Sequence, residues 1–444
     1  MIATVERAPA TTVSRLSTTS SEPWSLGTRA LFRLCFLYFG LYALTIQMLG
    51  DLLAIPGVDM PDIGKLPPLR QLILWVGHHV LHVPAVSAVT GSGDTLFDWS
   101  QGFTLLVFAV AGALVWSVGT SDTKRHDRLW PWFRVFLRFM LGTTLMHYGM
   151  IKLFPLQMPA PSLGRLLQQF GTFSPMGLIW SSIGSAEGYE RFIGSAEILA
   201  GLLLFLPATA LLGGLVALGV TIGVFAVNMT YDVPVKLFSF HLVLMSLIVI
   251  GPDIRRLIDV IVLNKATAPS PAPTIGRTPT AKRGWLMVQL AIGAWSVASF
   301  AYQSAQRWKN EGTGAPRSAL YGIWDVDSMT IDGALHVPLT TDTARFSHAV
   351  FQSTSRASFQ RMDQSFLRFA AVTDTVAHTI TLKKDADSTW TAKLAYHRPS
   401  SSRLDLEGDI DGSHVWVRMS LHDLKEFPLV GRGFHWVQEE PFSK

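Results

Sequence analysis

Long apolar runs separated by short polar stretches dominate the first two thirds of the chain. A bilayer core needs roughly 20 mainly apolar residues per helix, and runs of about this length predict seven transmembrane helices. They lie at 31–53, 97–118, 131–151, 192–206, 209–228, 233–251 and 285–302. The fourth run is short and contains Glu197, and the tight LPAT link to the fifth run favours a helical hairpin.

The pattern changes from residue 319 onward to short segments in which apolar and polar residues alternate. Eight such segments, with turn signals such as DG at 332–333 and 411–412 between them, are typical of strands. Eight consecutive antiparallel strands can close as an up-and-down barrel, which removes exposed edges. We therefore predict an all-β domain, as a barrel, with a β-sandwich as the alternative.

The first of these segments contains Gly322-x-Trp324. It resembles the G-x-W signature of lipocalin-like barrels, in which the tryptophan closes one end beneath a basic side chain from near the last strand. That resemblance implies Arg418 or Arg432 for the basic residue. The interior of a barrel of this size is either filled by side chains or holds one small molecule.

Composition agrees with a membrane protein, since only 16% of the 444 residues are charged and 49% are hydrophobic, against roughly 25% charged in soluble domains. The net charge of +5 comes largely from loops, and no basic face interleaved with aromatic residues indicates nucleic-acid binding. Cys35 is the single cysteine, so a dithiol cycle within the chain is excluded. The sequence also has no flavin or iron–sulfur signature.

Basic residues set the predicted orientation, because cytoplasmic loops are enriched in Lys and Arg. Arg29, Arg33, the segment DTKRHDR and the basic stretches between the sixth and seventh runs all fall on one side when seven helices are threaded in order. This places the N-terminus in the cytoplasm of a bacterium and the β domain outside the cell membrane.

The predicted domains follow from these boundaries. They are a disordered cytoplasmic tail (1–25), two transmembrane helices with a long external loop (26–128), a four-helix transmembrane module (129–263), a Pro- and Ala-rich cytoplasmic linker (264–284), the seventh transmembrane helix (285–303) and the extracytoplasmic β domain (317–444).

Polar side chains gather near the outer ends of four predicted helices. An ionisable group within a membrane span costs roughly 2.5–3.5 kcal/mol, so such groups usually face a bundle interior and find partners. We expect Lys152 or Lys236 to pair with Glu197 or Asp232. The full set is His147, Tyr148, Lys152, Glu197, Asn228, Asp232, Lys236 and His241. Lys152 as a snorkelling side chain, and Asn228 and Asp232 as loop and cap residues, are the structural alternatives.

The region 130–256 carries RFMLGTTLMHYGMIKLFP, GSAEILAGLLLFLPATALLG and NMTYDVPVKLFSFHL. These segments resemble the DoxX-like membrane family, a four-helix module whose kin include the DoxD subunit associated with thiosulfate:quinone oxidoreductase. The resemblance implies Lys152 and Glu197 as recurrent polar positions. It does not imply an activity, because most members have no assigned reaction.

Histidines offer two further arrangements. His78, His79 and His82 form H-H-x-x-H, which on a helix has metal-ligand spacing, although a helix lying on the membrane surface is the favoured interpretation and no metal site is predicted. His147 and His241 are at depths compatible with haem ligation, a minor alternative.

The leading hypothesis is a redox-associated subunit that binds a lipophilic carrier such as a quinone at the outer side of the bundle. Glu197, with Lys152 or Lys236, would exchange protons, and His147, Tyr148, Asn228, Asp232 and His241 would line the ligand site. Membrane lipids and an extracytoplasmic redox protein are the expected partners. A non-enzymatic lipid or small-molecule handling protein and a scaffold for extracytoplasmic proteins are the alternatives, so whether the chain is an enzyme stays open.

Overall fold

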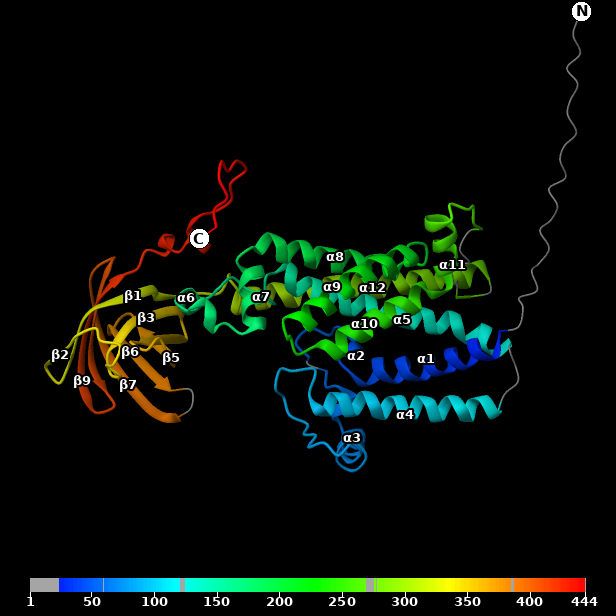
Figure 1. Ribbon diagram of the computed structural model, residues 1–444, viewed down its shortest axis with the longest axis horizontal. Coiled ribbons are helices and arrows are strands. Elements are labelled where there is room, and N and C mark those ends of the chain that lie inside the picture. The colour runs from blue at the N-terminus through cyan, green and yellow to red at the C-terminus, as the bar shows by residue number, and fades with distance from the viewer. Residues whose placement is uncertain are drawn as a thin grey trace, which may run out of the picture.

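The computed structural model describes residues 24–58, 60–119, 124–268, 275–276, 278–384 and 387–443. They form a bundle of long helices and a β-barrel that lies beyond one end of the bundle (Figure 1). We call this end the barrel end and the opposite end the far end. The predicted tail at 1–25 and part of the linker at 264–284 fall largely outside the described residues.

Eight helices build the bundle, and several shorter ones connect them. The bundle helices are α1 (Leu26–Thr45), α2 (Met48–Leu53), α4 (Leu96–Gly119), α5 (Lys124–Leu153), α8 (Glu187–Phe205), α9 (Ala210–Thr230), α10 (Lys236–Ile250) and α12 (Pro279–Asn310). The connecting helices include α3 (Leu69–His79), α6 (Leu163–Leu166), α7 (Pro175–Gly184) and α11 (Ile254–Leu257). All seven predicted runs therefore fall in helices.

Four helices among the described residues are long and apolar enough to cross a membrane, judged by length and composition. They are α4, α9, the segment Lys236–Val262 that begins with α10, and α12. The predicted count of seven is not supported. The first run is divided at Ile46–Gln47 into α1 and α2, α5 contains the buried residues Arg134 and Arg138, and α8 carries several charges.

The buried arginines of α5 donate hydrogen bonds to neighbouring helices, although Nη1 of Arg138 is buried without a hydrogen-bond partner among the described residues. Arg138 donates from Nε and Nη2 to the carbonyl oxygen of Leu204 at 2.9 and 2.7 Å. Arg134 donates from Nη2 to Asp253 at 3.0 Å. These bonds link α5 to the end of α8 and to the turn after α10.

The C-terminal strands close into a barrel, as predicted. The strands are β1 (Arg317–Ile331), β2 (Ala334–His336), β3 (Phe346–Ser353), β4 (Arg356–Arg361), β5 (Phe366–Asp374), β6 (Thr379–Lys384), β7 (Asp387–Ser400), β8 (Arg403–Ile410) and β9 (Ser413–Leu421). Each strand from β3 to β9 pairs antiparallel with the next, and β1 pairs with both β3 and β9. The closed barrel thus has eight strands, and β2 is a short addition to β1.

Trp324 closes the barrel end that faces the bundle. It is fully buried, and its Nε1 donates to the carbonyl oxygen of Leu320 at 2.8 Å. The predicted basic partner was wrong, because Arg398 of β7 lies over the Trp324 ring at 5.6 Å. Arg418 lies over Trp416 instead, and Arg432 over Phe442.

The barrel interior is filled by side chains, including Phe351, Phe359, Phe369 and Leu382. The cavity that remains inside measures about 10 Å³, roughly the space of a single water molecule. A larger cleft of about 330 Å³ lies at the opposite mouth, where Trp390 and Phe346 form part of its wall.

The barrel contacts the bundle side of the molecule through α6. Leu163 packs with Ile323 and Val350 on the outer surface of the barrel. Its backbone N–H donates to Oε1 of Gln352 at 2.9 Å. The segment that follows α5 is therefore fixed on the barrel wall (Figure 1).

Candidate functional site

A close approach between α5 and α8 positions the two charged residues that the sequence singles out. A Cβ atom on Gly149 would lie 2.7 Å from the carbonyl oxygen of Gly194, and one on Gly194 would lie 2.8 Å from Cβ of Lys152. Only glycine permits such contact between helix backbones. The side chain of Lys152 therefore starts directly against α8. Glu197 lies about one helical turn after Gly194 on that helix.

Lys152 and Glu197 form a buried ion pair. Nζ of Lys152 lies 2.7 Å from Oε1 and 2.6 Å from Oε2 of Glu197. Both residues are almost wholly buried, at 4% and 2% exposure. A buried charge without a partner is costly, so each side chain stabilises the charged form of the other. One of the predicted pairings is thus present, and snorkelling of Lys152 to the surface is not.

The pair lines a small cavity at the barrel end of the bundle. The cavity measures about 60 Å³ and is bounded mainly by apolar side chains. Its wall comes from α5, α7, α8, α9 and α10 and includes Leu145, Tyr148, Lys152, Gln157, Trp180, Glu197, Thr221, Val224, Asn228, Val233, Val235, Phe238, Ser239 and Leu242. We call this space the Lys152–Glu197 cavity.

Two other predicted residues lie in the same wall. The hydroxyl of Tyr148 accepts a hydrogen bond from Gln47 at 2.8 Å, and Nζ of Lys152 lies 5.5 Å from the centroid of the Tyr148 ring. Asn228 donates from Nδ2 to Oγ of Ser239 at 3.0 Å. The cavity thus combines one ion pair with several neutral hydroxyl and amide groups and with apolar side chains, a composition that is typical of small-molecule sites.

His147 is directed to a different neighbour. Its Nδ1 lies 2.7 Å from Oδ1 of Asp51 at the end of α2, and its ring stacks on Phe300 of α12 at 5.0 Å. Thr144 donates to the other oxygen of Asp51 at 3.1 Å. His147 therefore ties α5 to α2 and α12 and does not line the Lys152–Glu197 cavity.

His241 is held against α1. Its Nε2 lies 2.7 Å from the hydroxyl of Tyr38, its Nδ1 lies 2.7 Å from the carbonyl oxygen of Leu237, and the ring stacks on Tyr42 at 3.8 Å. Since both ring nitrogens have partners, a haem iron could bind His241 only by displacing Tyr38 or the backbone.

Asp232 and Lys236 form a separate pair at 2.8 Å, and the Asp232 side chain is 83% exposed. Asp94, from the segment before α4, accepts from the backbone N–H groups of Lys236 and Leu237, each at 2.8 Å. An acidic side chain at this position complements the positive end of α10. Neither Asp232 nor Lys236 lines the Lys152–Glu197 cavity, so the eight predicted polar residues divide among four local groups.

Sequence reasoning missed three acids at this end of the bundle, of which Asp51 and Glu190 are buried and Asp94 is half-buried. Asp51 and Asp94 hold His147 and the start of α10, and Glu190 accepts from the backbone N–H of Met158 at 2.9 Å. A signal was present for Asp51, which is a charge inside the first apolar run, and for Glu190, which lies two turns before Glu197. The partner of each lies far away in the sequence and gave no local signal.

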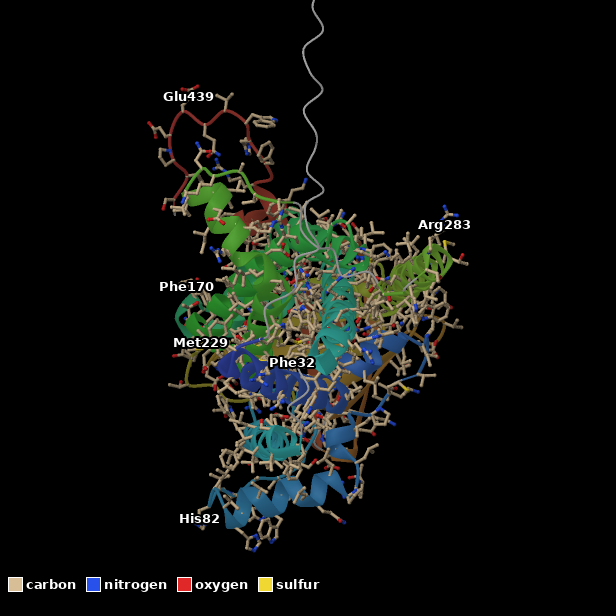
Figure 2. All side chains as sticks on the ribbon, turned by 90° about the vertical axis from the view of Figure 1, so that its right-hand side faces the viewer. Phe32, His82, Phe170, Met229, Arg283 and Glu439 are labelled. Atoms are coloured by element: carbon tan, nitrogen blue, oxygen red, sulfur yellow. The ribbon has the colours of Figure 1, made fainter. Side chains whose placement is uncertain are left out.

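The H-H-x-x-H histidines do not share one helix. α3 ends at His79, and His82 follows with a positive φ of 54°. Figure 2 places His82 at the edge of the molecule, away from Phe32 in the middle of the bundle. The part of the chain that the structure describes contains no group of three or more potential metal ligands.

Comparison with known proteins gives one partial match. The chain is 29% identical over 137 residues to the uncharacterized protein YwoB of Bacillus subtilis strain 168, and the match spans 79% of that protein and 29% of this chain. No family model matches the chain. No solved structure matches it either.

Proposed function

We propose that the chain is a DoxX-like integral membrane protein whose Lys152–Glu197 cavity binds the polar head of a lipophilic carrier such as a quinone, as part of a redox-associated complex. The observation that carries the proposal is the bidentate ion pair at the wall of a small, mainly apolar cavity. Buried titratable pairs in such surroundings are arranged where a proton or a polar ligand must be handled.

The same proposal assigns seven membrane-crossing helices, with the barrel outside the cell membrane. Basic residues support this orientation, because Arg29, Arg255, Arg256 and Arg283 belong to segments at the far end of the bundle. That end would then face the cytoplasm. α1 with α2, α5 and α8 complete the count, their charges being enclosed by neighbouring helices.

Each residue of the cavity has a distinct part. Glu197 accepts and releases a proton, Lys152 keeps the carboxylate charged when no ligand is bound, and Tyr148 and Asn228 offer hydrogen bonds to carbonyl or hydroxyl oxygens of the carrier. Electrons would come from an extracytoplasmic redox protein, with one proton for each electron added to a quinone. No residue of this chain needs to carry the electrons itself.

The size of the cavity limits what enters it. Its volume of about 60 Å³ is well below the roughly 300–1,000 Å³ of pockets that enclose whole drug-sized ligands. It holds a few water molecules or the oxygen-bearing edge of a ring. The rest of a carrier would lie along the apolar helices that surround the cavity.

The direct test is binding of a short-chain benzoquinone to the full chain in neutral detergent, measured by equilibrium dialysis. Glu197→Gln removes the carboxylate charge and should weaken binding at least tenfold, since hydrogen bonds to charged groups contribute about 1.5–3 kcal/mol. The control is Glu187→Gln on the same helix, because the Glu187 side chain is 38% exposed and pairs with Arg191 at 3.1 Å, away from the cavity wall.

Glu187→Gln should bind the quinone as the unmodified protein does. Equal binding by Glu197→Gln in folded protein would contradict the assignment of the cavity. No binding by the unmodified protein would contradict the choice of a quinone.

A second candidate function, handling of a small apolar molecule, rests on the mouth of the barrel. The cleft there measures about 330 Å³ and is lined by Phe346, Phe369 and Trp390 together with Arg361 and Lys384. A fluorescent probe with an aromatic body and an anionic group, such as anilinonaphthalene sulfonate, should bind there and be displaced by a ligand. Loss of that signal in Phe346→Ser would support this function, and an unchanged signal would remove its basis.

A further inference from the structure

A further cleft lies outside both sites described above, where α6 meets the outer surface of the barrel. It measures about 410 Å³, and three arginines line it: Arg165 of the α6 segment, Arg356 of β4 and Arg368 of β5. No carboxylate belongs to its wall as far as the structure describes it. The guanidinium groups of Arg165 and Arg368 make the local potential at the cleft positive.

The strand register places two of these charges together. In the β4–β5 ladder Ser358 pairs with Arg368, and Arg356 pairs with Ala370. Arg356 and Arg368 are therefore diagonal neighbours on the same outer face, a separation of roughly 7–8 Å at the backbone that long side chains can span.

Arg165 reaches the cleft from the bundle side because α6 is fixed on the barrel. Leu163 is held by Gln352, and a Cβ atom on Gly164 would lie 3.7 Å from the Phe366 ring. The Arg165 guanidinium lies 4.8 Å from the centroid of Phe173, and its Nη1 donates to Gln168 at 2.6 Å. These contacts orient the guanidinium and leave its other N–H groups for a ligand.

After Arg165, Arg368 supplies the second guanidinium group that a ligand can contact. It is exposed, and it forms no ion pair with any residue that the structure describes. Phe366, two residues earlier on the same face of β5, adds an apolar wall beside it. The cleft thus offers charged donors in a fork geometry that matches phosphate and carboxylate oxygens, next to a surface for an apolar group.

We propose that this cleft binds an anion bearing a phosphate group, through Arg165 and Arg368 with Arg356 beside them. The phosphate belongs either to the headgroup of an anionic membrane lipid, which the position of α6 next to the bundle makes accessible, or to a soluble phosphoester. Because one arginine comes from the bundle side and the others from the barrel, the bound anion would hold the two parts together. This inference does not depend on the proposed carrier site.

The test uses the full chain in neutral detergent with two probes, inorganic phosphate and phosphatidylglycerol, and with phosphatidylcholine as the control lipid. Inorganic phosphate is titrated by isothermal calorimetry, and phosphatidylglycerol or phosphatidylcholine is titrated by native mass spectrometry. Binding of phosphatidylglycerol but not of phosphate identifies a lipid headgroup as the source, whereas binding of phosphate identifies a soluble source. In either case the affinity should exceed that for phosphatidylcholine.

Arg368→Gln and Arg165→Gln should each weaken the tightest binding about tenfold or more. The control is Arg403→Gln, since Arg403 lies on β8, is 57% exposed and does not line the cleft. If Arg165→Gln loosens α6, the result for Arg368→Gln decides, because Arg368 belongs to β5 and not to α6. Failure of both probes to bind, or equal binding by Arg368→Gln and Arg403→Gln, would overturn the proposal.

Discussion

Gly149 and Gly194 face each other across the contact between α5 and α8, and neither leaves room for a side chain. A Cβ atom on Gly149 would lie 2.7 Å from the carbonyl oxygen of Gly194, and one on Gly194 would lie 2.6 Å from that of Gly149. This contact sets the distance between the helices that carry Lys152 and Glu197. The geometry of the ion pair therefore depends on two residues that have no polar side chain.

Gly194→Ala should separate the helices and destabilise the protein by about 1–3 kcal/mol, the usual cost of adding a methyl group to a packed interior. Gly188→Ala on the same helix is the matched control, because nothing lies within 4 Å of its added Cβ. We expect Gly188→Ala to be neutral or slightly stabilising. Thermal unfolding of both variants in the same detergent measures the difference, and equal melting temperatures would show that the contact does not set the packing.

Removal of one member of the Lys152–Glu197 pair should cost more than removal of both. Lys152→Met leaves the Glu197 carboxylate buried without its cation, which is expected to cost about 3–5 kcal/mol. Adding Glu197→Leu removes the orphaned charge, and the double variant should recover most of that loss. A double-mutant cycle of unfolding free energies tests this. Additive effects would mean that the two side chains do not interact in the folded protein.

Trp324→Ala should unfold the barrel locally. The change removes a fully buried side chain and its bond to Leu320, at a cost of about 3–5 kcal/mol. Hydrogen exchange should accelerate in β1 and β9 and stay unchanged in α5 and α8. Trp416→Ala is the control, because Trp416 is only partly buried, beneath Arg418. If both variants exchange at the same rate, Trp324 does not close the barrel.

The barrel should lose stability as the pH falls below about 6.5. Burial holds the pKa of His348 below its ordinary value of 6.5, and the neighbouring His422 adds to this, against the opposing effects of Asp325 and Gln360. As the pH falls, His348 therefore binds its proton at a lower pH in the folded state than in the unfolded state. The stability that this residue contributes is present above pH 6.5 and declines below it.

His348→Gln should reduce this decline. The measurement is pulse proteolysis of the barrel in urea at pH 7.5 and pH 5.5, comparing the unmodified protein with the variant. His414 has a pKa raised by Asp409 and Glu407 and acts in the opposite direction, but it is present in both proteins and cancels in the comparison. The same pH dependence in both would exclude His348 as its source.

The sequence predicted the helices and strands of this fold better than the number of helices that cross a membrane. Hydrophobic periodicity located the bundle helices, and strand alternation located the eight-stranded barrel, because both signals depend on neighbours close in the chain. The same signal overcounted spans, since a run such as 31–53 reads as continuous although the helix breaks between Thr45 and Met48. Arg398 as the partner of Trp324 was missed because it lies on β7, and the barrel closure that brings it there is non-local.

The candidate site was predictable in part for the same reason. Lys152 and Glu197 stood out as charges within apolar runs, and their pairing was one of the expected combinations. His147 and His241 stood out equally, but their partners Asp51 and Tyr38 come from α2 and α1, which local patterns could not place. The cleft lined by Arg165, Arg356 and Arg368 gave no signal in the sequence. These arginines lie far apart in the chain, and only the contact between α6 and the barrel brings them together.

An oxidised-minus-reduced difference spectrum of protein purified gently from native membranes tests the central claim most directly. The account predicts a quinone band in the near ultraviolet that is present in the unmodified protein and in Glu187→Gln and lost in Glu197→Gln. A spectrum without a quinone band from folded protein, or a band of the same size in Glu197→Gln, would contradict the role of the Lys152–Glu197 cavity as a carrier site.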